Sequence, residues 1–484
     1  MLRRNDRRRS RACAIMGAAT VFMSRPQCRV SGGRRRGVAV TKRSVVVGGG
    51  VLGAATARHL AGLGDEVLLL ESAPALGGLT ASQQIQTSSG RVTCDRFYHV
   101  FLRGDGRARQ WLRELELDHE VHWATVQSTC VHRGRAYPAS SAVDLARLPF
   151  LGIITKLRTG LAVLLGALAP PGRLFDTFTA DRWLLAMAGR QGTERLWRPL
   201  LAAKLGPYAG EVSAEFLRST FRRLALARFQ GRDGDLFGVV PGGYSRILQR
   251  AAEQLDRLGV RVHTGARVTS VERTEGGVAV SWTSDGHLHH ADADLVVVTL
   301  PAPAAASILP GLAPDELERL RSVPYLGVVD TTVLLRVAPD PAYITYIVDD
   351  VPLTSVIGLH ALVPPDETSG LFLVHLPRYS TPDDPLMQTA DEQVRDQFVA
   401  ALRQVYPSVA DADVQGWAVN RARYVMPVPV RGYAARAPSF TTSIPGVLTV
   451  GSAQMLTGTL NVESSLELLE RAIPAITATR EGRS

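Results

Sequence analysis

The segment Ser44–Leu79 constrains the fold of this chain more than any other part of the sequence. It begins with a short β-branched run, Ser44–Val47, which is typical of a buried parallel strand. Gly48, Gly50 and Gly53 then fit the spacing G-x-G-x-x-G. In that motif the glycines permit a tight turn, a close approach of the backbone to a pyrophosphate, and close packing of the following helix.

A helix and a second strand are predicted directly after the glycine turn. The helix begins with Val51 and Leu52 and ends near Leu63, so its amino end and its dipole would face the phosphates. The strand Glu66–Leu70 leads to Glu71, whose carboxylate can accept hydrogen bonds from a ribose hydroxyl. Because strands, helix and acidic residue all fall where dinucleotide binding needs them, the segment predicts a Rossmann-like domain.

The basic character of the chain is confined to its beginning. The chain has 484 residues and a formal net charge of +10. Residues 1–43 hold 13 Lys or Arg and one Asp, so the other residues hold 42 basic and 44 acidic side chains. The predicted folded part is therefore close to neutral, and its composition argues against binding to nucleic acid.

Residues 1–37 are rich in arginine and contain one apolar run, Ala12–Met23. We interpret them as a disordered basic tail or as sequence upstream of the true start. An export signal is the less favoured alternative because arginines follow the apolar run. The four cysteines lack the paired spacing of a metal site or a disulfide framework. We therefore expect a cytoplasmic protein that binds no metal.

A second glycine pair, Gly77 and Gly78, follows six residues after Glu71. This combination resembles the FAD-dependent amine oxidase and protoporphyrinogen oxidase superfamily, in particular its bacterial NAD(P)/FAD-dependent oxidoreductase branch, which is related to UDP-galactopyranose mutase. In that superfamily the pair lets the backbone pass close to the phosphate and the ribityl chain. The resemblance therefore implies FAD as the cofactor and adds Leu79 and Thr80 to the predicted contacts. The alternative is an ordinary turn after a strand.

Two later segments resemble the same superfamily. Val268 follows a Pro-Gly-Gly, helix and strand pattern, and it matches the residue whose main chain lies against the adenine. Gly451 and Ser452 end a strand, and Asn461 and Val462 open a helix whose positive end would stabilise negative charge on the flavin ring. No cysteine lies in this last segment, which implies that the FAD is not covalently bound.

The resemblance also indicates candidate catalytic residues. Tyr98 and His99 lie in an aromatic stretch similar to the segment that passes along the isoalloxazine, and Tyr424 lies in a stretch that leads back to it. A strand with a satisfied histidine and simple aromatic packing are the alternatives. Lys204, in a Lys-x-Gly sequence found in the same family, is explained as well by helix capping, which we favour.

Residues 105–235 are predicted to be mostly helical. The stretch Leu148–Leu168 is the most apolar part, and Lys156 and Arg158 are its only charged residues. It could line a channel for a hydrophobic substrate or make a weak peripheral contact with a membrane surface. We expect instead that it forms a helix packed in the core.

The resemblance implies an α/β fold, α+β overall, in which a Rossmann-like FAD-binding domain is interleaved with a largely helical substrate domain that contains an antiparallel sheet. We expect the FAD-binding parts to span residues 38–104, 237–310 and 440–484. The substrate-domain parts would span residues 105–236 and 311–439.

We expect an FAD-dependent oxidoreductase that moves hydride from a bulky or hydrophobic substrate to flavin N5, with dioxygen or another electron acceptor as its oxidant. One alternative is a non-redox flavoenzyme that acts on a nucleotide sugar, as UDP-galactopyranose mutase does. Another is an FAD-binding protein without turnover. The sequence leaves the substrate and the oligomeric state open.

Overall fold

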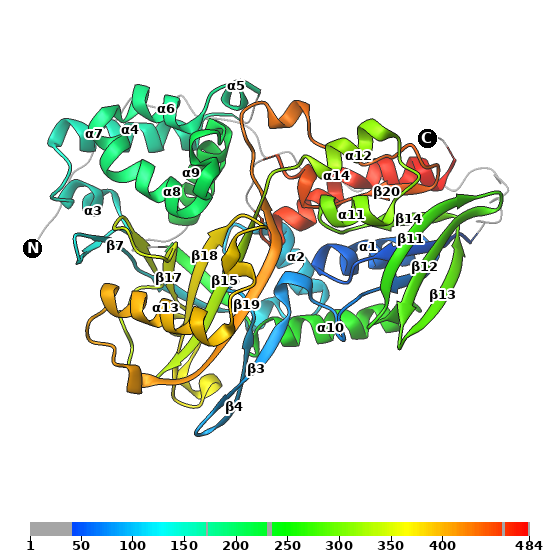
Figure 1. Ribbon diagram of the computed structural model, residues 1–484, viewed down its shortest axis with the longest axis horizontal. Helices are drawn as coiled ribbons and strands as arrows, with labels where there is room; N and C mark the ends of the chain where they lie inside the picture. The colour runs from blue at the N-terminus through cyan, green and yellow to red at the C-terminus, as the bar shows by residue number, and fades with distance from the viewer. Residues whose placement is uncertain (1–40, 171–172, 230–234, 457–459, 483–484) are drawn as a thin grey trace, which may run out of the picture. The chain divides into compact units, whose positions relative to one another are not determined.

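The computed structural model describes residues 41–170, 173–229, 235–456 and 460–482 (Figure 1). The described residues all belong to one compact unit, Thr41–Ser484. The predicted basic tail, residues 1–37, lies outside the described residues.

A five-stranded parallel sheet carries the glycine-rich segment. Its strand order is β10-β2-β1-β14-β20, and β1 pairs with both β2 and β14. Val and Leu dominate these strands and are buried on both faces, as expected of a parallel sheet covered on both sides. The strands are β1 Arg43–Val47, β2 Glu66–Leu70, β10 Arg261–His263, β14 Leu295–Val298 and β20 Val447–Thr449.

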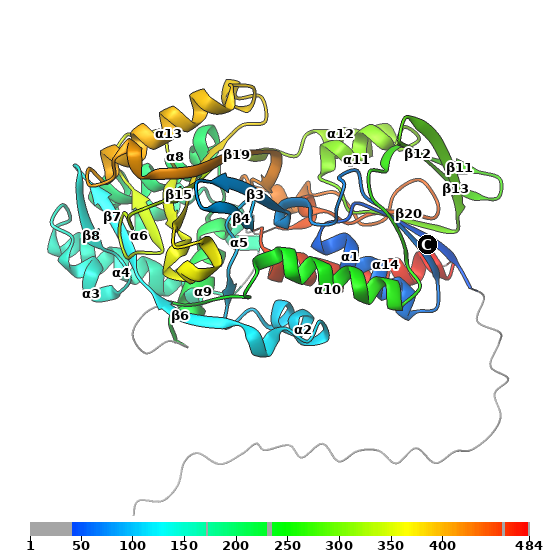
Figure 2. The same cartoon turned by 90° about the horizontal axis from the view of Figure 1, so that it is seen from below.

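Three helices cover one face of this sheet, and a small antiparallel sheet with two further helices lies on the other face (Figures 1 and 2). The first face carries α1 Val51–Gly62, α10 Gly243–Arg257 and α14 Val462–Arg480. The second carries β11 Arg267–Thr274, β12 Gly277–Ser284, β13 His287–Ala293, α11 Ala302–Ile308 and α12 Pro314–Arg321.

Helix α14 is longer than the sequence indicates. From the sequence, the helix that Asn461 and Val462 open is predicted to end near Ile473, before Pro474, whereas the helix continues to Arg480 with Pro474 inside it. Ala472 and Ile476 are both fully buried, so packing continues on either side of the proline and compensates for the hydrogen bond that proline cannot make.

A seven-stranded sheet forms the second large layer, with strand order β19-β15-β18-β17-β16-β7-β8. Helix α13 Asp391–Val405 packs on one of its faces. All neighbouring strands are antiparallel except β16 and β7. The strands are β7 Ser128–His132, β8 Arg135–Pro138, β15 Tyr325–Leu335, β16 Ile344–Ile347, β17 Ser355–Gly358, β18 Phe372–Ser380 and β19 Val414–Pro427.

The prediction of a mostly helical segment over residues 105–235 is only partly right. Three strands form inside this segment, and a fourth, β9, begins at its end. The hairpin β7–β8 joins the large sheet through the pairing of β7 with β16, and β9 pairs with both β5 and β6. The small three-stranded sheet consists of β5 Phe101–Leu102, β6 His122–Val126 and β9 Asp235–Val239. A separate hairpin consists of β3 Ser82–Thr87 and β4 Gly90–Asp95.

The helices of this segment other than α2 Gly106–Glu114 gather beside the large sheet (Figure 1), whereas α2 packs against α14 in the core of the parallel sheet. The helices beside the large sheet are α3 Ala142–Arg147, α4 Ile153–Leu168, α5 Arg173–Asp176, α6 Ala180–Met187, α7 Gly189–Gly192, α8 Arg198–Leu205 and α9 Ala214–Phe229. The expectation that Leu148–Leu168 is a core helix is wrong. In α4 only Thr159, Ala162 and Gly166 are buried, because α6, α7 and α9 lie against the face that carries Thr159 and Gly166.

The predicted fold class is confirmed: a Rossmann-like parallel sheet combines with a helical part that adjoins a mainly antiparallel sheet. The domain boundaries stay a prediction. None of the helices formed by the described residues is both long and apolar enough to cross a membrane.

Candidate active site

The first glycine turn packs tightly against the start of α1. Gly48 follows β1 with φ +106°, a conformation that favours glycine. A Cβ atom on Gly53 would lie 1.8 Å from the carbonyl oxygen of Gly48. The helix can therefore approach the strand only because Gly53 has no side chain, as the motif requires.

Gly50 faces open space at the amino end of α1. A Cβ atom there would meet only the carbonyl oxygen of Gly77, at 3.9 Å. The first turn of α1 has no capping side chain and no acidic residue, and the first helical hydrogen bond runs from Ala54 N to Gly50 O (2.9 Å). The amides before that bond belong to Val51, Leu52 and Gly53. With the helix dipole they form a cradle that fits a diphosphate.

Glu71 is held rigidly at the end of β2. Its side chain is buried. One carboxylate oxygen accepts from Gly49 N (2.6 Å) and the other from Ala73 N (2.7 Å). Ser72 Oγ also donates to this second oxygen (3.3 Å). An ionised carboxylate has about four acceptor positions, so Glu71 retains capacity for one hydroxyl of a ribose beside the glycine turn.

The second glycine pair lies directly on the first. Gly77 N donates to Gly49 O (2.9 Å), and Gly77 forms an isolated parallel bridge with Gly50. Gly77 and Gly78 have φ values of +147° and +56°. Thr80 Oγ1 donates back to Gly77 O (2.9 Å), while Leu79 is half-buried. The structure thus brings the two predicted glycine segments and Glu71 into one cradle.

The predicted residues near the carboxyl end approach the same sheet edge. Gly451 follows β20, and a Cβ on it would lie 2.4 Å from Leu300 O, after β14. Ser452 Oγ lies 2.9 Å from the hydroxyl of Tyr325. Val268 lies half-buried in β11, beside the parallel sheet.

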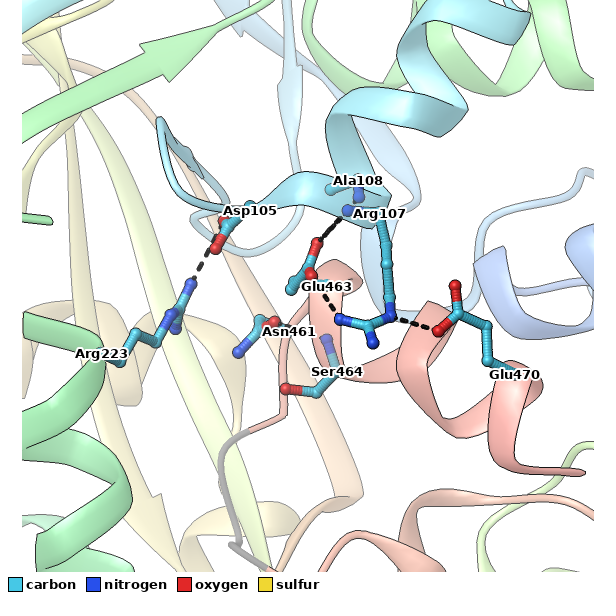
Figure 3. A network of polar contacts seen from close by, with 8 residues as sticks. All are labelled: Asp105, Arg107, Ala108, Arg223, Asn461, Glu463, Ser464 and Glu470. Atoms are coloured by element: carbon cyan, nitrogen blue, oxygen red, sulfur yellow. Dashed lines mark hydrogen bonds and ion pairs between the residues drawn. The ribbon is translucent and has the colours of Figure 1, made fainter. Parts of the chain in front are cut away.

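The amino end of α14 is anchored to α2 by a network of polar contacts (Figure 3). Asn461 caps α14, with its side chain accepting from Ser464 N (2.9 Å), and the buried Val462 opens the helix. Glu463 caps α2, because its carboxylate accepts hydrogen bonds from the backbone amides of Arg107 (2.8 Å) and Ala108 (2.9 Å). The side chain of Arg107 bridges Glu463 (3.1 Å) and Glu470 (2.6 Å). These contacts fix where α14 begins.

A polar cluster lies on the face of the large sheet opposite α13. We define it as Tyr98, Lys204, Asp330, His375 and Tyr379. Strand alternation puts His375 and Tyr379 of β18 on that face, while Val374 and Leu376 pack in the core beneath α13. The hydroxyl groups of Tyr98 and Tyr379 lie 3.2 Å apart.

Lys204 sets the ionisation of Tyr379. Its Nζ lies 3.5 Å from the centre of the Tyr379 ring. Burial opposes loss of the phenol proton, but the positive charge of Lys204 and hydrogen bonds from Lys204 and Tyr98 hold the pKa of Tyr379 below its usual value. Burial and the neighbouring Tyr379 raise the pKa of Tyr98 well above its own usual value. Tyr379 is therefore the more acidic of the two phenols in the cluster.

Asp330 and His375 form a fully buried pair. An Asp330 carboxylate oxygen lies 2.7 Å from His375 Nδ1, and Thr332 Oγ1 lies 3.3 Å from the same nitrogen. Asp330 Oδ1 and His375 Nε2 are buried without a hydrogen-bond partner among the described residues. The ring of Tyr98 lies 6.1 Å from that of His375.

The other predicted catalytic residues lie in separate surroundings. His99 packs on Tyr244 (5.2 Å between ring centres), and its Nδ1 lies 2.9 Å from Phe97 O. Burial lowers the pKa of His99 to about 4, so its imidazole is neutral near pH 7. Tyr424 packs edge-on against Tyr325 (5.6 Å), which itself contacts Ser452.

Sequence reasoning missed Asp330, His375 and Tyr379 and assigned Lys204 to helix capping. A signal existed for two of them. Asp330 is the only charged residue in β15, a strand of eleven buried residues, and His375 interrupts the apolar run Phe372–Leu376. A lone titratable residue in a buried strand marks a polar partner or a functional site.

Known proteins resemble this chain in sequence and in fold. Residues 53–467 match a family described as flavin containing amine oxidoreductase. The chain is 24% identical over 464 residues to zeta-carotene desaturase from Synechocystis sp., covering 85% of this chain and 92% of that protein. It is 26% identical over 288 residues to hydroxysqualene dehydroxylase from Sinorhizobium fredii, covering 55% of this chain and 63% of that protein. The structure of cyclohexylamine oxidase from Brevibacterium oxydans superposes with a TM-score of 0.66 at 18% identity, covering 91% of this chain and 100% of that one.

Proposed function

Because the chain belongs to the flavin-containing amine oxidoreductase family, we propose that it binds FAD non-covalently and oxidises a bulky, apolar substrate. The observation that carries the proposal is the glycine cradle. Its amides and the open space at Gly50 suit a diphosphate, and Glu71 is fixed where a ribose would follow.

The remaining FAD contacts follow from the cradle. Val268 would present its main chain to the adenine. Gly451, Ser452, Asn461 and Val462 would surround the far end of the flavin. Burial raises the pKa of Cys94 to about 12 and that of Cys130 to about 11. Neither thiol is therefore suited to form a thioether, which supports non-covalent binding.

A residue of the chain would accept the proton that the substrate loses during oxidation. Formation of a carbon–carbon double bond removes one hydride and one proton from the substrate, and bound flavin supplies the acceptor for the hydride at N5. We propose that the phenolate of Tyr379 accepts this proton, because Lys204 stabilises that phenolate beside Tyr98. The family implies an electron acceptor that reoxidises the flavin.

The names of the two curated relatives support the substrate class. One is a desaturase of a carotene and the other a dehydroxylase of hydroxysqualene. We propose that the substrate here is likewise a long, isoprenoid-like molecule.

The test is anaerobic reduction of the purified yellow protein. Isoprenoid-like hydrocarbons, and a primary amine for comparison, are added without air while the colour of the oxidised flavin is followed. The proposal expects bleaching by a hydrocarbon and its reversal by an electron acceptor. A protein that contains no flavin and takes up none would refute it. Bleaching by the amine alone would refute the substrate class, and product formed only with pre-reduced flavin, without net electron flow, would favour the mutase alternative.

A further inference from the structure

Helix α4 presents an apolar face to solvent. Its most exposed side chains are Ile153 (78% exposed), Ile154 (75%), Leu157 (71%) and Leu168 (66%), and Leu161, Leu164 and Leu165 are exposed as well. Most of these residues are three or four positions apart, so they share one face, opposite the buried Thr159, Ala162 and Gly166. Contiguous apolar surface of this kind marks an interaction site. We call these seven exposed residues the apolar face of α4.

Positive charge borders this face. Each residue turns the helix by about 100°, which places Lys156 on one edge of the apolar face and Arg158 on the other. The guanidinium of Arg158 stays exposed while it donates to the carbonyls of Met187 (3.0 Å) and Ala186 (2.8 Å). Residues 145–175 contain four basic residues and no acidic residue.

We infer that the apolar face of α4 docks on an anionic lipid bilayer, with the helix lying in the plane of the interface. Basic side chains at both edges of an apolar helix face complement lipid phosphates and let the aliphatic side chains enter the boundary of the acyl chains. The same charges would repel each other if two copies paired through this face. The 16-residue helix is about 24 Å long, shorter than the ~30 Å hydrocarbon core, so it fits on a membrane and not across it.

The test is sedimentation of the full chain with vesicles of equal parts phosphatidylcholine and phosphatidylglycerol. Leu157→Asp places a charge at the centre of the apolar face, and it should weaken binding at least about tenfold. Leu288→Asp is the matched control, because Leu288 is 59% exposed on β13, and this variant should bind as the wild type does. The flavin colour of both variants should be unchanged, which separates this test from that of the proposed function.

Two results would overturn the inference. Equal binding of wild type and Leu157→Asp would assign the lipid affinity to other basic residues, such as the 13 within residues 1–43. The second result is a wild type that is dimeric by ultracentrifugation without lipid, together with a Leu157→Asp variant that is monomeric. It would mean that the apolar face of α4 binds a second copy of the chain.

Discussion

The ammonium group of Lys204 lies 3.5 Å from the centre of the Tyr379 ring. The two residues come from different layers, because Lys204 lies in the last turn of helix α8 and Tyr379 lies in β18 of the large sheet. The contact places a cation against a buried phenol whose hydroxyl also meets that of Tyr98.

This contact predicts how turnover depends on pH. The phenolate of Tyr379 is the proton acceptor in our proposal, so activity should rise as pH increases through its pKa. Lys204 lowers that pKa, and Lys204→Met should therefore move the rising limb to higher pH. The measurement is the pH profile of kcat/KM, together with titration of tyrosinate absorbance. Lys156→Met, on α4, should leave both curves in place.

An unchanged rising limb in Lys204→Met would contradict the assignment of Tyr379. Tyr379→Phe provides the second control, because it should abolish the limb while the flavin stays bound.

The glycine cradle predicts that three substitutions of the same kind have three different results. Gly50→Ala adds a Cβ with no close neighbour, so the fold should remain while flavin affinity falls at least about tenfold, since the diphosphate needs that space. Gly53→Ala places a Cβ 1.8 Å from Gly48 O and should lower the free energy of unfolding by more than about 2 kcal/mol. Gly62→Ala meets no neighbour within 4 Å and should retain both stability and flavin.

The measurements are urea unfolding of the flavin-free protein and titration with FAD. If Gly50→Ala bound FAD as tightly as the wild type, the diphosphate could not lie on α1.

The cradle could be predicted from the sequence because its parts are local. The glycines and Glu71 lie on consecutive elements, and a strand, turn, helix and strand in this order have one preferred arrangement. The polar cluster could not be predicted in this way. Lys204 contacts Tyr379 only because α8 packs on β18. Asp330 contacts His375 only because β15 pairs with β18 in one register, and these strands are distant in the sequence.

Helix α4 illustrates the same limit. Its composition indicated an apolar helix, but composition cannot decide which face another element covers. The strands β7 and β8 likewise lie in a segment with helical character. They pair with each other as a hairpin, and β7 joins the large sheet because the distant β16 offers an open edge.

His99 predicts a dependence of stability on pH. Burial lowers its pKa to about 4, against about 6.5 in an unfolded chain. Between these values the unfolded chain binds a proton that the folded chain does not. The contribution of neutral His99 to the free energy of unfolding is therefore fully present above about pH 6.5 and is lost as the pH falls toward 4.

His99→Asn should remove this term and gain stability relative to the wild type at pH 4 by up to about 3 kcal/mol. The comparison must be between the two proteins. Burial raises the pKa of the nearby Asp95 to about 6. Protonation of Asp95 therefore increases the stability of the folded chain as the pH falls over a similar range, which opposes the effect of His99 in both proteins. Urea unfolding at pH 4, 5 and 7 measures the difference, and a constant difference over this range would contradict the prediction.

The Asp330–His375 pair predicts a graded loss of stability. Both side chains are fully buried, and the carboxylate lies 2.7 Å from His375 Nδ1. Asp330→Ala should lower the free energy of unfolding by about 3 kcal/mol, because it leaves a buried imidazole without its main partner. Asp330→Asn retains an oxygen acceptor and should cost only about 1 kcal/mol.

Thr331, the next residue in β15, provides the control. It is also fully buried, but its hydroxyl has no hydrogen-bond partner among the residues that the structure describes. Thr331→Val removes that unpaired hydroxyl at nearly constant shape, so it should be neutral or stabilising by about 1 kcal/mol. Equal losses for Asp330→Ala and Asp330→Asn would mean that the hydrogen bond to His375 contributes little, and that shape alone holds this part of the sheet together.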